Sequence, residues 1–227
     1  MATHLWLITA KTNLHVGNEN TSGTGVIDKA VQRDALTGLP CINASSLKGA
    51  INEYCTFHGM PDADRKKMFG SDKSGKNPGY QKGTAIFFDA KILYLPMQCD
   101  LVPYQLATRA EAVAEILDRA KLLGLEGVTE SVLNAKVDCK FGYDVLDCVA
   151  FKELCDDEHL PVIARNKLDN GTSENLWYEQ VIPAETVFCA MTTDPDDQLA
   201  EWLDGKYIQI GANATIGYGL CLFTKVL

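Results

Sequence analysis

The sequence predicts an α+β fold in which one sheet carries helices, and three observations lead to that prediction. The chain has 227 residues, of which 46% are apolar, so it can bury the core of one large domain or of two small ones. Its apolar positions follow the two-residue period of strands in some stretches and the spacing of three or four residues of helices in others. These stretches do not alternate strictly, as a wholly parallel sheet would require. We therefore expect a sheet with helices on one face.

The first elements are a strand and a helix joined by a long loop. Residues 3–10 show the two-residue period of a strand with both faces covered. Residues 17–25 (GNENTSGTG) are turn formers that cannot pack a core, so we expect an exposed, mobile loop directly before Asp28. Helical spacing begins at Ser45, a credible N-cap, and ends at Gly59.

The middle of the chain predicts a central strand and a well-marked helix. Residues 84–95 are almost continuously apolar, as in a strand at the centre of a sheet, and they follow a lysine-bearing loop at 71–83. Thr108 and Glu111 form a capping-box pattern, which opens an amphipathic helix that Gly124 closes.

The last third predicts two helices, three strands and an insertion. One helical pattern covers 144–155, and another follows Asp194-Pro195 as far as Gly205. Strand patterns occupy residues 177–192, 206–210 and 218–226. The polar stretch at 161–176 is long for a loop of a compact domain, so we interpret it as an insertion. A single domain over residues 1–227 with a ferredoxin-like or RRM-like core sheet fits this order.

The charge and the cysteine content limit the possible partners and the cellular location of the protein. The net charge of −9 argues against a phosphate-rich partner, because like charges repel. Residues 1–91 nevertheless carry a net +3 and residues 92–227 a net −12, so a nucleic-acid face would lie mainly in the first half, unless the split reflects only an acidic solvated surface. The eight cysteines show no CxxC spacing, and the chain start has no basic, signal-like region. We expect free thiols and a cytoplasmic protein.

Four segments stand out together, and a fifth sharpens their meaning. They are LHVGNENTSGTGVID-x3-QRD at 14–34, TGLPCINASSLKGAI at 37–51, FFDAKILYLP at 87–96, IGANATIGYGL at 210–220, and LWYEQVIPAETVF at 176–188. In combination they resemble the RAMP superfamily of CRISPR proteins, and within it the backbone-subunit family of the type III-B Cmr complex. The resemblance covers about two thirds of the chain and leaves residues 97–161 unassigned.

The resemblance implies a subunit that stacks in several copies along a CRISPR RNA, beside other Cmr-type subunits. Such a subunit cleaves complementary target RNA in a divalent-metal-dependent reaction, in which a 2′-OH attacks the neighbouring phosphate. The aspartate required for cleavage corresponds to Asp28, where the alternative from the residues alone is a turn-forming or salt-bridged aspartate. An ordinary aspartate is ionised at neutral pH and is a good ligand for magnesium, so we expect Mg²⁺ at Asp28.

Further positions are assigned by the same resemblance. His15, Tyr178 and Glu179 correspond to residues near the cut site, although a lone histidine is commonly structural. The insertion at 161–176 resembles a thumb that presses between guide and target RNA. Residues expected to contact RNA are Arg33, Ser46, Lys48, Arg165, Lys167, Trp177, Gly211, Gly217 and Gly219.

Each RNA contact has a physical reason and an ordinary alternative. Glycines let a sugar-phosphate chain approach the backbone closely, but they also simply form turns. Lys48 lies at a helix start, where an anion is favoured, or it is a solvated lysine. Arg33 offers a fork of donors to a phosphate, or it pairs with Asp28 or Asp34. Trp177 either stacks on a base or packs in the core.

The sequence also departs from the family pattern. The closing loop, residues 210–220, has Ala212, Ala214 and Tyr218 where the family usually has a glycine, an acidic residue and a basic residue. Asn52 stands where the family commonly has a basic residue. Each loss weakens phosphate contacts in a chain that is already net negative. A non-catalytic, structural RNA-binding filament subunit is therefore the alternative function. Neither GxxxxGK[ST] nor a Rossmann spacing occurs, which argues against a nucleotide-binding enzyme.

Overall fold

The computed structural model describes residues 2–17, 26–71 and 81–227. The mobile loop predicted at 17–25 lies outside the described residues except for Gly17, as does most of the loop predicted at 71–83. Within the described residues the strands are β1 (Ala2–Ala10), β2 (Cys41–Ile42), β3 (Ile86–Phe87), β4 (Ala90–Met97), β5 (Gln105–Arg109), β6 (Tyr143–Leu146), β7 (Val162–Asp169), β8 (Thr172–Gln180), β9 (Val187–Asp194), β10 (Tyr207–Gln209) and β11 (Leu220–Lys225). The helices are α1 (Ala44–Phe57), α2 (Asp62–Phe69), α3 (Ala110–Leu122), α4 (Glu130–Asn134), α5 (Cys148–Leu154) and α6 (Leu199–Leu203), with a 3₁₀ turn at Ala214–Ile216.

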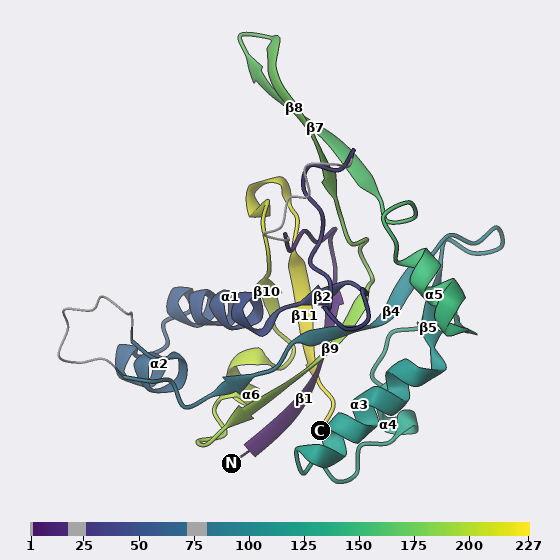
Figure 1. Ribbon diagram of the computed structural model, residues 1–227. Coiled ribbons are helices and arrows are strands. Elements are labelled where there is room, and N and C mark those ends of the chain that lie inside the picture. The colour runs from purple at the N-terminus through teal and green to yellow at the C-terminus, as the bar shows by residue number, and fades with distance from the viewer. Residues whose placement is uncertain (1, 18–25, 72–80) are drawn as a thin grey trace.

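One large, mostly antiparallel sheet forms the body of the molecule (Figure 1). Its strand order is β10-β11-β1-β9-β4-β5-β6, with β2 and β3 paired to β4 and β9 respectively. Strand β1 is antiparallel to both β11 and β9, and β5 runs parallel to β6. The predicted strand at 84–95 divides into β3 and β4, and β4 lies inside the sheet between β9 and β5. The predicted combination of a sheet with helices is confirmed, and the sheet is mostly antiparallel.

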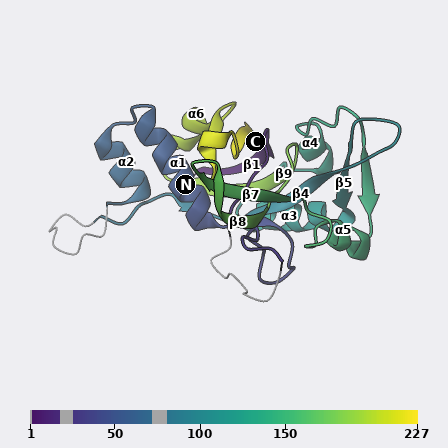
Figure 2. The same cartoon turned by 90° about the horizontal axis from the view of Figure 1, so that it is seen from above.

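Helices cover both faces of this sheet, so the prediction of helices on one face is wrong. Trp6 and Ile8 of β1 share a core cluster with Leu47 and Ile51 of α1. Leu5, on the opposite face of the strand, belongs to a second cluster with the apolar side of α3. Strands β1 and β9 are apolar on both faces, and each apolar face must be covered. Figure 2 shows α1 and α2 towards one end of the molecule and α3, α4 and α5 towards the other.

Two predicted helix caps are wrong because tertiary contacts replace them. Helix α1 begins at Ala44 rather than Ser45, and its first amide donates to the carboxylate of Asp89 at 2.7 Å. Thr108 does not cap α3, since its hydroxyl donates to the carbonyl oxygen of Leu93 at 2.7 Å within the sheet. Helix α6 begins at Leu199, later than predicted, although Asp194 does accept the Leu199 amide at 3.0 Å.

Two other predicted elements were joined or misassigned. The helical pattern at 144–155 contains the end of β6 followed by α5, and α5 begins after Asp147. The strand predicted at 177–192 is two strands, β8 and β9, separated by a turn in which Glu185 has a φ of 69°. The edge strand β6 is too short for periodicity to mark it, whereas Pro183 in the turn between β8 and β9 was a usable signal that a single strand does not continue there.

Strands β7 and β8 form a separate hairpin that projects from the body of the molecule (Figure 1). It is the predicted insertion at 161–176, extended at its C-terminal end to Gln180. Most of its side chains are exposed, and burial begins at Glu179 and Gln180, where the hairpin meets the sheet. All eight cysteines are free thiols, as expected. None of the helices in the described ranges is both long and apolar enough to cross a membrane.

Candidate functional site

The candidate site is assembled where the end of β8 meets the segment that follows residue 26. The amides of Asp28 and Lys29 both donate to the carbonyl oxygen of Tyr178, at 3.0 and 3.1 Å. The amide of Gln180 donates to the carbonyl oxygen of Lys29 at 2.9 Å. Residues 150 positions apart are thus joined through backbone hydrogen bonds at the base of the hairpin.

Asp28 lies at the surface of this junction. Its side chain is exposed, and its Oδ2 atom accepts the amide of Tyr178 at 2.7 Å. Among the described residues it has no ion-pair partner, so the salt-bridged alternative finds no support there. The backbone contact fixes one oxygen of the carboxylate and leaves the other directed elsewhere. An exposed, oriented carboxylate can serve as a metal ligand or stand beside a bound phosphate.

Glu179 is the opposite case, a carboxylate with only 1% of its surface exposed. Its Oε1 atom accepts a hydrogen bond from the side-chain amide of Asn213, and its Oε2 atom lies 3.4 Å from both the guanidinium of Arg165 and the indole nitrogen of Trp177. Buried charges persist in proteins when they are paired and hydrogen-bonded, as this one is. Glu179 therefore joins the two hairpin strands to the loop that contains Asn213.

His15 is buried beside Glu179. Its Nδ1 atom lies 2.7 Å from the carbonyl oxygen of Gln180 and 3.8 Å from Oε1 of Glu179. A carbonyl oxygen can only accept, so Nδ1 carries the proton. With 4% of its surface exposed, His15 contacts the protein interior rather than solvent. The structure thus brings His15, Asp28, Tyr178 and Glu179 together, with Asp28 and Tyr178 exposed and the other two buried.

Trp177 is half-buried and lies near two cationic side chains rather than in the core. The Lys29 ammonium is 5.2 Å from the centroid of its ring, and the Arg165 guanidinium carbon is 5.4 Å away. Both distances suit cation–π attraction. Arg165 also donates to the side-chain oxygen of Asn213 at 2.6 Å. Lys167 is exposed further along the hairpin, where it pairs with Glu174 at 2.5 Å.

The three glycines of the closing loop differ in their surroundings. A Cβ atom at Gly211 would overlap the carbonyl oxygen of His15, and one at Gly219 would overlap that of Ile210. A Cβ atom at Gly217 would meet nothing within 4 Å. Gly211 and Gly219 are therefore required by the protein's own backbone packing, and Gly217 faces open space.

Arg33 and the start of α1 lie next to the junction. Arg33 donates to the carbonyl oxygens of Gly38 and Cys155, and it forms an ion pair of 2.7 Å with Asp157, so the pairing suggested with Asp28 or Asp34 is wrong. The hydrogen bond from Gln180 and the Arg33 contact lower the pKa of Asp157, against the opposing effect of burial.

Ser46 and Lys48 lie on the first turns of α1, half-buried. The backbone amide of Asn43, the N-cap residue, donates to the Gln32 side chain at 2.8 Å, which links this helix start to the segment carrying Asp28. The carboxylate of Asp89 already accepts the first helical amide. An anion approaching α1 therefore meets a negative charge at that amide as well as Lys48.

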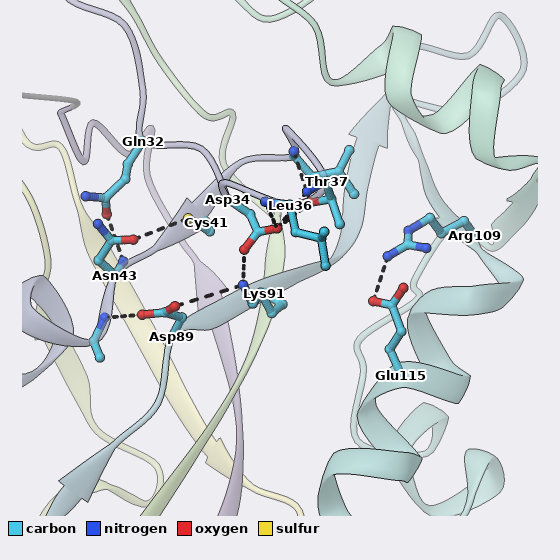
Figure 3. A network of polar contacts seen from close by, with 12 residues as sticks. Gln32, Asp34, Leu36, Thr37, Cys41, Asn43, Asp89, Lys91, Arg109 and Glu115 are labelled. Carbon is cyan, nitrogen blue, oxygen red and sulfur yellow. Dashed lines mark hydrogen bonds and ion pairs between the residues drawn. The ribbon is translucent and has the colours of Figure 1, made fainter. Parts of the chain in front are cut away.

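Lys91 and Arg109 belong to neighbouring ion pairs rather than to the junction. Lys91 contacts Asp34, and Arg109 pairs with Glu115 at 2.8 Å (Figure 3). Lys91 and Glu115 line two hollows of about 240 and 490 Å³ near β4 and α3, and Asp34 and Arg109 line the larger one. Neither hollow is lined by Asp28 or Glu179, so we place the candidate site by its hydrogen-bond geometry and not by cavity size.

A metal ion at Asp28 would depend on ligands from outside the chain. No group of three or more histidine, cysteine or acidic side chains is suitably placed to bind a metal within the described parts of the chain. Magnesium commonly keeps several waters and takes other contacts from substrate phosphates, so a single exposed carboxylate suits it. The donor set fits a cation shared with RNA and does not fit a closed protein site.

Asn213 and Lys29 are the site residues that the sequence prediction missed. Asn213 has a φ of 68°, and asparagine is enriched in this left-handed conformation. An asparagine between the glycines of a closing loop was therefore a usable signal for a special backbone position. Lys29 had only its place beside Asp28 to mark it.

Comparison with known proteins identifies relatives along the whole chain. The chain is 28% identical to the CRISPR system Cmr endoribonuclease Cmr4 of Pyrococcus furiosus, over 90% of each chain. It is 31% identical, over 37% of its length, to the CRISPR system Cms endoribonuclease Csm3 of Mycobacterium tuberculosis.

Solved structures share its fold. One from a type III-B Cmr-beta complex bound to cognate target RNA matches with a TM-score of 0.78 at 22% identity, covering 100% of this chain and 98% of the other. Oligomeric Cmr4 from Pyrococcus furiosus matches with a TM-score of 0.73 at 20% identity, covering 99% of each. The RAMP superfamily model matches residues 7–222. The chain therefore belongs to the RAMP superfamily.

Proposed function

We propose that this protein is the backbone subunit of a type III-B CRISPR effector complex, which binds CRISPR RNA and cleaves complementary target RNA. The extent of similarity to Cmr4, a named endoribonuclease, supports this assignment. The single observation that carries the catalytic part is the exposed carboxylate of Asp28, oriented by the Tyr178 amide at the base of the projecting hairpin. We place the protein in the cytoplasm, where such a complex would meet its RNA.

The proposed reaction is attack of a target-strand 2′-OH on the neighbouring phosphate. The 2′-OH loses its proton as the new O–P bond closes a cyclic phosphate, the bond from phosphorus to the 5′ oxygen breaks, and that oxygen takes up a proton as it leaves. A divalent cation, Mg²⁺ in our proposal, would be held by Asp28 and would neutralise phosphate charge when bound. Asp28 would hold this cation, and Lys29, the next residue in the chain, brings a positive charge over the nearby Trp177 ring.

The partners proposed are CRISPR RNA, target RNA, further copies of this chain and other Cmr-type subunits. The relatives include an oligomeric Cmr4 and a complex with bound target RNA, which supports both kinds of partner. The β7–β8 hairpin suits the role of a thumb between guide and target, because it extends away from the sheet with mostly exposed side chains. Gly217, Tyr178 and Lys167 are exposed, so RNA could approach them.

We also propose that the core is ferredoxin-like. The path β1-α1-β4-β9-α6-β11 contains four strands in the order β11-β1-β9-β4, with antiparallel neighbours throughout. That order and those directions are what a ferredoxin-like sheet requires. The strands β5 and β6 would then be an extension of the core sheet.

The catalytic assignment is tested with Asp28→Asn in the assembled complex. Asparagine keeps an oxygen that can accept the Tyr178 amide but loses the charge. We expect single-turnover cleavage of labelled target RNA in Mg²⁺ to fall by roughly a hundredfold or more, with guide RNA still bound. Asp144→Asn, on the exposed edge strand β6 away from the junction, is the matched control and should cut at the wild-type rate. Wild-type cutting by the Asp28 variant would contradict the assignment.

A second candidate function is a structural RNA-binding filament subunit that does not cut. The observation that favours it is the altered closing loop, with Ala212, Ala214 and Tyr218 at positions where other residues are usual. Complementary RNA that stays intact when bound to the wild-type complex in Mg²⁺ would establish this function. Regularly spaced products that chelation of the metal abolishes would rule it out.

A further inference from the structure

Asn213 bridges the glycine-rich closing loop, residues 210–220, and the base of the β7–β8 hairpin. Its side-chain amide donates to the buried carboxylate of Glu179, and its side-chain oxygen accepts a hydrogen bond from Arg165 at 2.6 Å. Arg165 and Glu179 come from the two strands of the hairpin, whereas Asn213 comes from the glycine-rich loop. One side chain thus fastens the loop to the base of the hairpin.

We propose that Asn213 is a positioning residue, which locks the glycine-rich loop onto Glu179 and thereby holds Asp28 in the geometry needed to cut target RNA. This inference rests on the proposed function and deepens it. Asn213 reaches Asp28 through the three residues at the end of β8. Glu179 holds Asn213 by its side chain, while its neighbour Tyr178 binds Asp28 through both its amide and its carbonyl.

The segment around Asp28 depends on this strand end from both sides. Lys29 forms a β-bridge with Glu179, and the amide of Val31 donates to the side chain of Gln180 at 3.1 Å. On the other side, the carbonyl oxygen of Gln180 accepts a hydrogen bond from Nδ1 of His15. A shift of Glu179 therefore moves the backbone that orients the Asp28 carboxylate.

Asparagine is suited to this position by conformation and by chemistry. The backbone has a φ of 68° and a ψ of 27°, a left-handed conformation that most side chains disfavour. The site needs a donor towards Glu179 and an acceptor towards Arg165, and one amide supplies both. Aspartate would keep the acceptor but place a second carboxylate against Glu179. Glycine would keep the backbone and lose both contacts.

The test compares Asn213→Gly and Asn213→Asp with the wild type in the assembled complex. Glycine tolerates the left-handed backbone, so Asn213→Gly removes the bridge without adding strain. Asp197→Gly is the matched control. Asp197 also has a left-handed backbone, with a φ of 55°, and its replacement removes a 2.8 Å contact with His4, outside the site. The thermal midpoint of each variant shows that it is folded.

The expected result separates rate from binding. Both Asn213 variants should retain guide RNA and bind target RNA within about threefold of the wild type, while single-turnover cleavage at saturating target falls about tenfold or more, as misplacement of reacting groups predicts. The control variant should cut at the wild-type rate. Wild-type cleavage by both Asn213 variants would overturn the proposal.

Exchanging the carboxylate and the amide between positions 179 and 213 should rescue cleavage. In the double variant Glu179→Gln with Asn213→Asp, glutamine donates to aspartate, and aspartate still accepts from Arg165. Donor and acceptor have changed places and the net charge is the same. We expect this double variant to cut within about threefold of the wild type, several times faster than Asn213→Asp alone. A double variant as slow as the single one would contradict a positioning role.

A readout without cleavage keeps this inference distinct from the proposed function. The amides of Asp28 and Lys29 should exchange their hydrogens about tenfold faster in Asn213→Gly, because their shared acceptor at Tyr178 becomes less ordered. Unchanged exchange would overturn the positioning role even if the complex cuts. A wild-type complex that does not cut would refute the catalytic function, and amide exchange would still decide whether Asn213 orders the Asp28 segment.

Discussion

Two acidic residues at the junction have different environments, and their environments separate their roles. Asp28 is exposed and has one oxygen oriented by a backbone amide, whereas Glu179 is buried beneath three side-chain donors. An exposed carboxylate can reach a substrate or a metal ion. A buried carboxylate that is already hydrogen-bonded organises the protein around it. The resemblance placed both near the cut site, and burial distinguishes them.

The closing loop provides a matched pair of glycines for a stability test. Gly211 and Gly217 have similar φ angles, 77° and 82°, but only Gly211 is packed against backbone, at His15. We expect Gly217→Ala to lower the free energy of unfolding by about 1–2 kcal/mol, the cost of the left-handed conformation alone. Gly211→Ala should cost roughly 3 kcal/mol or more, because the loop must move. Urea unfolding measures both, and equal losses would show that Gly211 is not packed as described.

Asp34 makes folding sensitive to acid. Burial raises the pKa of Asp34, but hydrogen bonds from Lys91 and Thr37 and the charge of Lys91 outweigh it and lower the pKa to about 2 (Figure 3). A lowered pKa stabilises the fold above the unfolded-state value near 4 and loses that contribution as the pH falls towards 2.

We therefore expect Asp34→Asn to lower the free energy of unfolding at pH 7 by about 2 kcal/mol, and the difference from the wild type to vanish as the pH falls from 4 to 2. Urea unfolding at several pH values measures this. Asp62→Asn, which removes the ion pairs of an exposed carboxylate with Arg65 and Lys66, is the control and should change little. A difference at pH 2.5 as large as at pH 7 would refute the linkage.

At the scale of elements, the hairpin depends on its base. Isolated two-stranded hairpins are marginally stable in water, and most side chains of β7 and β8 are exposed. The contacts that hold the hairpin to the body gather at Glu179 and Gln180. The helix starts show the same dependence on distant residues, since Asp89 caps α1 from 45 positions away. The sequence pattern predicted the approximate positions of the hairpin and of α1, but not the distant residues that stabilise them.

Shortening the hairpin should separate folding from function. Replacing residues 167–175 with Asn-Gly leaves Asn166 and Leu176, which are paired, on either side of a two-residue turn. We expect the thermal midpoint to stay within a few degrees of the wild type, because few buried contacts are lost. Regularly spaced cleavage products should disappear while guide RNA remains bound. An unchanged product ladder would refute the thumb role, and a chain that fails to fold would refute the claim that the base carries the hairpin.

At the scale of the whole molecule, charge along the sequence differs from charge in space. The first 91 residues carry the net positive charge, and they supply Lys29 to the junction. Arg165 comes from the acidic part of the chain, yet it lies beside the same tryptophan ring. The prediction that the first half of the chain supplies the basic face was therefore incomplete, because Arg165 from the second half contributes as well. A folded surface mixes residues from distant segments, so the sum over a segment does not describe the field that RNA would meet.

The sequence by itself determined the strand and helix periods, the free thiols, the extra segment near 161–176 and the superfamily, while its choice of Asp28 stays a prediction. Those features depend on residue types within a few positions of one another or on motifs that can be read directly. Only the tertiary structure decided that helices cover both faces, that Arg33 pairs with Asp157, and that Asn213 joins Glu179 to Arg165. Burial and hydrogen-bond pairing depend on contacts between segments far apart in the chain, and the spacing of residues within one segment does not specify those contacts.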